Sequence, residues 1–286
     1  YDPRNMIDVI RVLKLQESYA QDEARAAGRD APERDNWLAS HPSNDQRLQA
    51  ISNNAARYQG RYADDGTRRF QQAIAGMRFG ESPEQGLTRG PDFYHPSMGF
   101  ALTAPAGWRI QHNAEALDIV HPEGDAALRL MTVPPKAGGT HDEVLRNAFK
   151  VGQGQVTRGT VNGFAATHFN GTVQGAKGQA QAAEFTLITG PKQTTYAMLY
   201  LAANATARQR ALAGLMAAEK SFRPLTAADA QAARPWQIRL LPFPRGGYAE
   251  LARQSVVPAR QLQLINGSYG RADPPLGQTV KTVVAQ

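Results

Sequence analysis

The chain has 286 residues, a formal net charge of +7, 42% hydrophobic residues and 20% charged residues. This composition is typical of a globular protein with two or three domains and argues against an intrinsically disordered chain. The absence of cysteine excludes disulfides, thiolate metal sites and a cysteine nucleophile. No apolar run of about 18 residues is present, so we expect no transmembrane segment.

Residues 1–79 have the apolar spacing of short amphipathic helices, which predicts a helical N-terminal region. Asp2 and Pro3 suit the first turn of a first helix. A second helix is expected to begin near Ser43, a good N-cap residue, and a third follows Gly66. Each helix has a single apolar stripe, so we expect the three to pack on a larger partner.

Residues 80–92 form a connector rich in glycine and proline, and residues 93–224 have the pattern of short strands separated by turns. Thr140 and Asn204 are predicted to cap two helices within this pattern. The arrangement predicts an α+β domain with an antiparallel sheet. The strands are expected at residues 100–103, 108–110, 117–120, 128–133, 163–170, 182–189 and 194–201.

Residues 225–235 are predicted as a second linker, and residues 236–286 as a small βααβ end domain. Its strands are expected at 237–241 and after 275–280, and its helices near 248–254 and 258–265. Asn266 and Gly267 form a good stop signal for the second of these helices.

The end domain is basic, with seven Lys or Arg residues against two acids from residue 234 onward. Such a surface suits an anionic cell-wall polymer, anionic lipid or nucleic acid, but it is equally compatible with an ordinary solvated face. No aromatic ladder, zinc finger or RNP motif is present, so nucleic acid is not an expected partner.

A catalytic zinc site needs three protein ligands and an open position for water. No two of the six histidines have the i, i+4 spacing of an HExxH helix, and His121 and His141, each beside a carboxylate, are predicted as surface or capping residues. There is no Gly-x-Ser-x-Gly, P-loop or dinucleotide fingerprint either. A Ser/His/Asp triad stays open, because its members are distant in sequence.

The chain begins Tyr1-Asp-Pro-Arg-Asn-Met6 and continues to His41-Pro-Ser-Asn-Asp-Gln-Arg47. This order resembles the segment downstream of the zinc site in HtpX-like zinc metallopeptidases (metallopeptidase family forty-eight). Those enzymes carry an HExxH helix and a later glutamate ligand, then a "GYDPRAM"-like helix and an "HPxxxxR" helix. The resemblance implies the C-terminal region of a bacterial zinc-dependent metalloendopeptidase that acts on protein or peptide substrates.

The same resemblance implies auxiliary catalytic roles for His41 and Arg47. His41 would lie near the zinc-bound water and donate a hydrogen bond to the tetrahedral intermediate, or occupy the open zinc position. Arg47 would orient the neighbouring carboxylate ligand or bind substrate. Zinc belongs to the parent enzyme; without an HExxH helix we expect this chain to hold no cofactor and to be inactive alone. The alternative for His41-Pro is an ordinary turn before a helix.

Two further stretches resemble known families. Gly99-Phe-Ala-Leu-Thr-Ala-Pro-Ala-Gly-Trp108 is similar to the opening of PsbP-like domains. The end domain, with "LINGS" and "PLGQTVK", resembles LysM carbohydrate-binding modules. That family contributes glycan contacts from a "GDTL" turn, which is here Arg245-Gly-Gly-Tyr248. The expected fold is therefore multi-domain α+β: N-terminal helices, a PsbP-like antiparallel α+β domain and a LysM-like βααβ domain.

These resemblances place the chain in the periplasm or cell envelope, where it would position substrate for the peptidase or anchor it. The alternative is a non-catalytic module that binds peptidoglycan or serves in envelope assembly.

Overall fold

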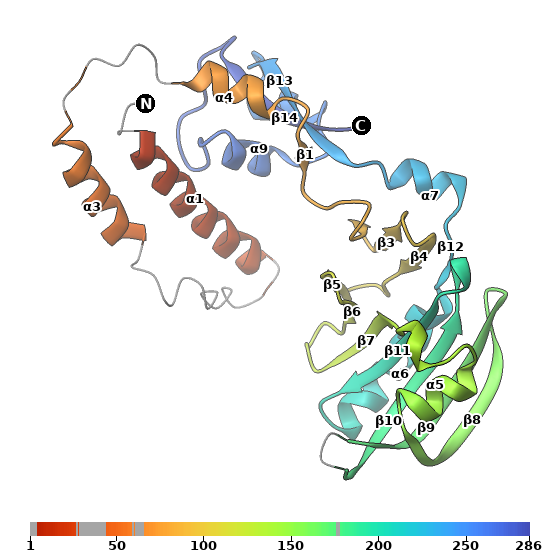
Figure 1. The fold of residues 1–286 in the computed structure, drawn as a ribbon. Coiled ribbons are helices and arrows are strands. Elements are labelled where there is room, and N and C mark those ends of the chain that lie inside the picture. The colour runs from red at the N-terminus through yellow and green to blue at the C-terminus, as the bar shows by residue number, and fades with distance from the viewer. Residues whose placement is uncertain (1–4, 27, 29–43, 59, 61–65, 176–177) are drawn as a thin grey trace. The chain divides into compact units, whose positions relative to one another are not determined.

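The computed structural model describes residues 5–26, 28, 44–58, 60, 66–175 and 178–286 (Figure 1). Helices and antiparallel sheets make up this part of the chain, which confirms the prediction of a multi-domain α+β fold. The chain divides into two compact units, Tyr1–Phe79 with Trp236–Gln286, and Gly80–Pro235. The first unit thus joins two segments that the sequence analysis treats as separate domains.

The first unit contains the N-terminal helices α1 (Asn5–Ala26), α3 (Asn44–Ala55) and α4 (Thr67–Ile74). Their positions agree with the three predicted helices, although Ser43 lies outside the described residues. α1 packs against α3 and also against α9 (Ala259–Ile265) of the end domain. None of the described helices is both long and apolar enough to cross a membrane.

The end domain has the predicted βααβ order: β13 (Trp236–Pro242), α8 (Gly247–Ala252), α9 (Ala259–Ile265) and β14 (Thr279–Ala285). β13 pairs antiparallel with β14, and the short strand β1 (Arg78–Phe79) adds to the outer edge of β13. The two helices bury apolar side chains against this sheet. The core consists of Phe243, Tyr248, Leu251, Val257, Leu262, Val280 and Val283.

Asn266, directly after α9, braces this domain. Its side-chain amide donates to the carbonyls of Leu262 and Lys281 at 2.8 and 2.9 Å, and its Oδ1 accepts from the Lys281 backbone N–H at 2.8 Å. The end of α9 is therefore bonded directly to β14.

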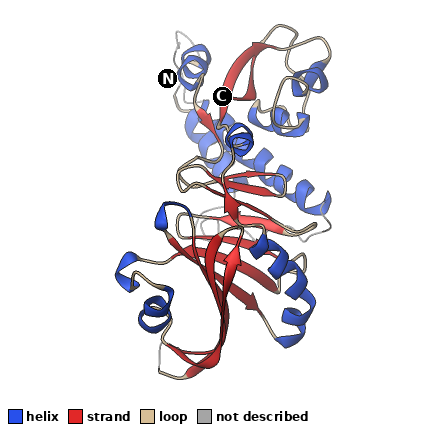
Figure 2. Cartoon of the chain, turned by 90° about the vertical axis from the view of Figure 1, so that its right-hand side faces the viewer, coloured by secondary structure: helices blue, strands red, loops and turns tan. Residues whose placement is uncertain are grey.

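The second unit is built on a large antiparallel sheet (Figure 2). This sheet has seven strands in the order β5-β6-β7-β11-β10-β9-β8. A four-stranded sheet of order β12-β4-β3-β2 accompanies it. The larger sheet contains β5 (Arg109–His112), β6 (Ala116–Val120), β7 (Ala126–Thr132), β8 (Val151–Val161), β9 (Phe164–Gln174), β10 (Ala180–Thr189) and β11 (Thr195–Ala202). The smaller contains β2 (Leu87–Arg89), β3 (Asp92–His95), β4 (Phe100–Thr103) and β12 (Arg223–Pro224).

Successive side chains of a strand face opposite sides of a sheet, and here both sides are covered. On one side α5 (His141–Asn147) contributes Val144 and Leu145 to a cluster with Phe185. On the other, α6 (Ala205–Lys220) and the smaller sheet share a core that contains Phe100 and Tyr196. Short 3-10 helices at Pro135–Ala137 and Pro191–Gln193 complete the unit.

Both helix caps predicted in this unit are present. The Thr140 side chain accepts from the Glu143 backbone N–H in a capping box, and the Asn204 side chain accepts from the Ala207 backbone N–H at 2.9 Å. Such caps satisfy backbone donors that have no partner within the helix.

Strand β8 has no counterpart among the strands predicted from the sequence. Ten of its eleven residues are at least partly exposed, and glycine and polar residues separate its few valines. The strand therefore lacks the alternation of apolar and polar residues that marks a half-buried strand. Gly154 and its partner Gly171 bring β8 and β9 unusually close, because a Cβ on Gly154 would lie 2.7 Å from the Gly171 Cα. β8 is held by backbone pairing with β9, to which the two-residue turn Asn162-Gly163 joins it.

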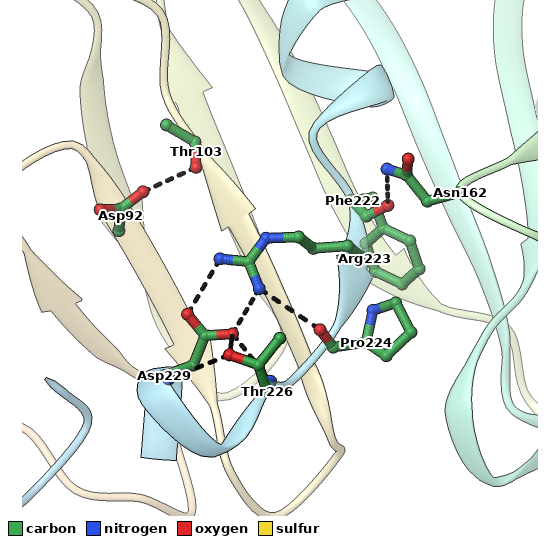
Figure 3. Close-up of polar contacts among 8 residues, drawn as sticks. All are labelled: Asp92, Thr103, Asn162, Phe222, Arg223, Pro224, Thr226 and Asp229. Atoms are coloured by element: carbon green, nitrogen blue, oxygen red, sulfur yellow. Dashed lines mark hydrogen bonds and ion pairs between the residues drawn. The ribbon is translucent and has the colours of Figure 1, made fainter. Parts of the chain in front are cut away.

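The range 225–235, predicted as a linker, contains helix α7 (Ala227–Ala232). Figure 3 shows why it is ordered: the Arg223 guanidinium donates two hydrogen bonds to the Asp229 carboxylate, one of them at 2.9 Å. The Thr226 backbone N–H and hydroxyl also donate to Asp229, at 2.8 and 2.7 Å. Arg223 belongs to β12, so this ion pair ties α7 to the smaller sheet.

The other predicted connector, 80–92, contains β2 and the first residue of β3. Leu87 is fully buried there, and the Thr88 backbone N–H donates to the Glu81 carboxylate at 2.7 Å. Burial and hydrogen bonding therefore order a segment whose composition suggests a loop.

Candidate functional site

The first unit has a basic hollow of about 320 Å³. Ligand pockets in proteins are of this size or larger. α1, α3 and the loop between α9 and β14 surround it. The lining residues are Arg11, Lys14, Leu15 and Ser18 of α1, Leu48 of α3 and Arg271 of the loop.

The four α1 residues share one helix face because their spacing is i, i+3, i+4 and i+7. Ser18 donates from Oγ to the Lys14 carbonyl at 3.3 Å, and Arg11 forms an ion pair with Asp8 at 2.9 Å. On this face Arg11 and Lys14 are exposed and Leu15 is half-buried, as is Leu48 of α3.

A network of aromatic and charged side chains holds the α9–β14 loop against α1. The Tyr269 hydroxyl donates to Asp22 Oδ2 at 2.6 Å and accepts from Arg260 at 2.7 Å. Arg260 also bonds Glu23 at 2.9 Å. Its guanidinium lies 5.8 Å from the Tyr19 ring centre and 5.7 Å from that of Tyr269, within cation–π range. Arg271 follows two residues after Tyr269 and so reaches the hollow.

The electrostatic character of the hollow is cationic. Arg11, Lys14 and Arg271 line it, and none of the described lining residues is an acid. Asp8 offsets Arg11 in part, while Asp22 and Glu23 are engaged by Arg260. Such an arrangement suits a carboxylate, phosphate or sulfate group, and the two leucines offer an apolar contact next to it.

Of the two predicted site residues, the structure describes Arg47 but not His41. Arg47 lies half-buried on α3, directly before the lining residue Leu48. His41 lies outside the described residues, so its predicted position near a zinc-bound water stays a prediction.

The described histidines near carboxylates have structural hydrogen bonds. His141, at the start of α5, lies between the hydroxyls of Thr167 and Thr189, at 2.8 and 3.0 Å. His121 Nδ1 accepts from the Glu123 backbone N–H at 3.3 Å, and the His121 ring lies edge-on to the Trp108 ring. Within the described part of the chain, no group of three or more His, Cys, Asp or Glu side chains could hold a metal ion. The described residues thus do not fit a zinc site, and no catalytic step is assigned to one.

The turn that the LysM resemblance associates with glycan contacts is only partly available. Tyr248 is 3% exposed, and its hydroxyl shares a 2.5 Å hydrogen bond with Ser268 Oγ. Burial raises the pKa of Tyr248. Its ring is a core element, whereas Arg245 is exposed. Glycan contacts from this turn would therefore have to involve Arg245 and the backbone.

The basic character of the end domain, which includes Arg271, follows from the sequence, but the α1 residues that face Arg271 do not. The i, i+3, i+4, i+7 pattern of residues 11–18 is visible in the sequence. Its pairing with a loop about 250 residues later is not.

Comparison with known proteins gives little. No family model matches the chain, and no curated protein matches it. Among solved structures, one that it resembles is LpqN, a protein involved in cell envelope biogenesis of Mycobacterium tuberculosis. The identity is 14% and the TM-score 0.28, and the alignment covers 43% of this chain and 82% of LpqN.

Proposed function

We propose that the chain is a binding module of the bacterial cell envelope, whose first unit holds an anionic cell-wall polymer such as peptidoglycan in the basic hollow. The observation that carries this proposal is the convergence of Arg11, Lys14 and Arg271 on one hollow without an acid among its described lining residues. The βααβ fold of the end domain and its LysM-like sequence support a glycan as the ligand.

The hollow suits the chemistry of such a polymer. Peptide carboxylates would pair with the cations, while a sugar ring or methyl group would pack on Leu15 and Leu48. Exposed ion pairs contribute only about 0–1 kcal/mol each and are screened by salt. Retention of the protein on the polymer would therefore depend on the many repeated binding sites that the polymer offers.

Charge reversal in the hollow tests this proposal. We expect Arg271→Glu to raise the Kd for purified peptidoglycan sacculi about fivefold, corresponding to roughly 1 kcal/mol. Arg11→Glu should act in the same direction, and raising the salt concentration should weaken the wild type.

The matched control is Arg239→Glu, which makes the same charge change on an exposed position of β13 in the same unit. It should retain nearly full binding, and circular dichroism checks that all variants are folded. If Arg239→Glu loses as much binding as the hollow variants, the loss is explained by net charge alone. If both hollow variants bind fully, the proposed site is refuted.

A more specific proposal is that this module serves a zinc metalloendopeptidase, as substrate-positioning or anchoring region. It is supported by the order of Tyr1–Met6 and His41–Arg47, and by the position of Arg47 on α3 next to the hollow. Zinc, His41 and Arg47 would then act together in the parent enzyme on protein or peptide substrates.

A zinc determination and a casein-cleavage assay test this second proposal, on this chain and on the whole open reading frame that encodes it. Stoichiometric zinc and cleavage by the full product, lost in His41→Ala, would support it. A full product with neither zinc nor cleavage would refute the peptidase and leave the binding module unaffected.

A further inference from the structure

Tyr269 has a central place in the contact between α1 and the end domain. Its side chain is buried, and its hydroxyl donates to Asp22 Oδ2 of α1 at 2.6 Å and accepts from Arg260 of α9 at 2.7 Å. The Tyr269 ring also meets the Tyr19 ring edge-on, with the ring centres 5.3 Å apart. One hydroxyl group therefore joins three elements: α1, α9 and the turn that contains Tyr269.

This turn is formed by residues 268–271. The Arg271 backbone N–H donates to the Ser268 carbonyl at 2.9 Å, and Gly270 has a φ of 66°. A left-handed residue at the third position is what a type II turn requires. Tyr269 and Arg271 are thus the second and fourth residues of one tight turn. A contact that fixes Tyr269 therefore also fixes the backbone at Arg271.

The start of the turn is anchored to the end domain, whereas the chain directly after it is exposed. Ser268 is buried, its backbone N–H donates to the Gln263 carbonyl at 2.9 Å, and its hydroxyl bonds to the Tyr248 hydroxyl. Residues 271–273 are exposed. The position of Arg271 therefore depends on the two buried residues that precede it in the turn, Ser268 and Tyr269.

Arg271 lines the basic hollow together with Arg11 and Lys14 of α1, whereas Tyr269 does not line it. A long side chain on an exposed loop loses conformational entropy when it binds a ligand, and a backbone that is already fixed reduces this loss. The hydrogen bonds of Tyr269 would therefore favour binding at the hollow although Tyr269 does not contact the ligand.

We propose that Tyr269 is the positioning residue of the basic hollow: its hydroxyl, held between Asp22 and Arg260, fixes the turn that places Arg271 beside α1. This inference rests on the proposed function, because the hollow is the site proposed to bind the polymer. It goes beyond that function in making the affinity depend on a residue outside the lining of the hollow.

Tyr269→Phe tests the proposal, because it removes the hydroxyl and keeps the ring. We expect it to raise the Kd for purified peptidoglycan sacculi about twofold to threefold, less than the roughly fivefold effect that an exposed ion pair can have. In a double-mutant cycle with Arg271→Gln, Tyr269→Phe should have no further effect on the Kd once Arg271 is replaced, because Tyr269 acts through Arg271.

A second measurement needs no ligand. The ¹⁵N{¹H} NOE of the Arg271 backbone amide reports mobility on the ps–ns timescale, and it should fall in Tyr269→Phe. Tyr58→Phe is the matched control, because it removes a hydroxyl from a side chain of the same unit that is 67% exposed and does not line the hollow. It should leave both the Kd and the NOE unchanged, and circular dichroism checks that all variants are folded.

The proposal is overturned if Tyr269→Phe leaves the Arg271 NOE unchanged, or if it weakens binding by the same factor with and without Arg271. It is also overturned if Tyr269→Phe binds sacculi like the wild type while Arg271→Gln binds more weakly. A wild type that does not bind sacculi refutes the proposed function instead, and the NOE comparison then still decides whether Tyr269 positions Arg271.

Discussion

We expect the ion pair between Arg223 and Asp229 to contribute strongly to the stability of the second unit. Asp229 is 6% exposed, and its carboxylate accepts hydrogen bonds from the Arg223 guanidinium and from the backbone and hydroxyl of Thr226. Asp229→Asn keeps the shape of the side chain but removes its charge and replaces one acceptor oxygen with a donor. The amide would then face the Arg223 guanidinium without compensation.

The expected cost follows from these contacts. Breaking one partner of a buried ion pair costs about 3–5 kcal/mol, and because a third of the Arg223 side chain is exposed we expect about 2–3 kcal/mol. For a unit of this size, that corresponds to a fall in Tm of about 4–12 °C. Asp142→Asn is the control, because the Asp142–Arg158 pair is exposed and should contribute less than about 1 kcal/mol.

The effect should depend on pH. The Arg223 guanidinium, together with hydrogen bonds from Thr226, holds the pKa of Asp229 well below its ordinary value of 3.8 although burial opposes this. A lowered folded-state pKa gives stability that is fully present above the unfolded-state pKa and is lost as pH falls through the folded-state pKa. The difference between wild type and Asp229→Asn should therefore be constant above about pH 5 and shrink below about pH 4.

Thermal unfolding of both variants at pH 7 and pH 3, followed by circular dichroism, measures these differences. A loss at pH 7 no larger than that of Asp142→Asn would refute the reasoning. So would a difference that grows as the pH falls.

Two further predictions concern packing and bracing. Asn266→Ala removes three hydrogen bonds to the backbone, two of them to Lys281. It should destabilise the first unit by about 2–3 kcal/mol in urea unfolding. An unchanged unfolding midpoint would mean that water replaces these hydrogen bonds. Gly214→Ala should cost about 1–2 kcal/mol and alter tryptophan fluorescence, because its Cβ would lie 2.3 Å from Trp108 Cζ2. Gly159→Ala, which meets nothing within 4 Å, should stay within about 0.5 kcal/mol, and equal effects of the two would contradict the steric explanation.

Local signals in the sequence were sufficient to predict several features that depend on residues close together in the chain. Thr140 and Asn204 were identified as helix caps because capping involves side chains and amides only three residues apart. The βααβ order of the end domain was likewise predicted from its apolar spacing and from Asn266-Gly267, which end the second helix. These features determined the α+β fold class.

Two segments, β8 and α7, were not predicted although the sequence carries local signals for both. β8 forms a hairpin with β9, the next strand, through the two-residue turn Asn162-Gly163, and Asn-Gly between two strands is a strong hairpin signal. α7 begins with a capping box between Thr226 and Asp229, and its alanines favour a helix.

The sequence by itself determined the basic character of the end domain, since charge is a property of composition. Only the tertiary structure decided that Arg271 faces Arg11 and Lys14 of α1, and that Tyr269 lies between Asp22 of α1 and Arg260 of α9. The physical reason is the same in both cases. A binding site depends on which side chains converge in space, and that is set by helix packing and strand register across segments far apart in the chain.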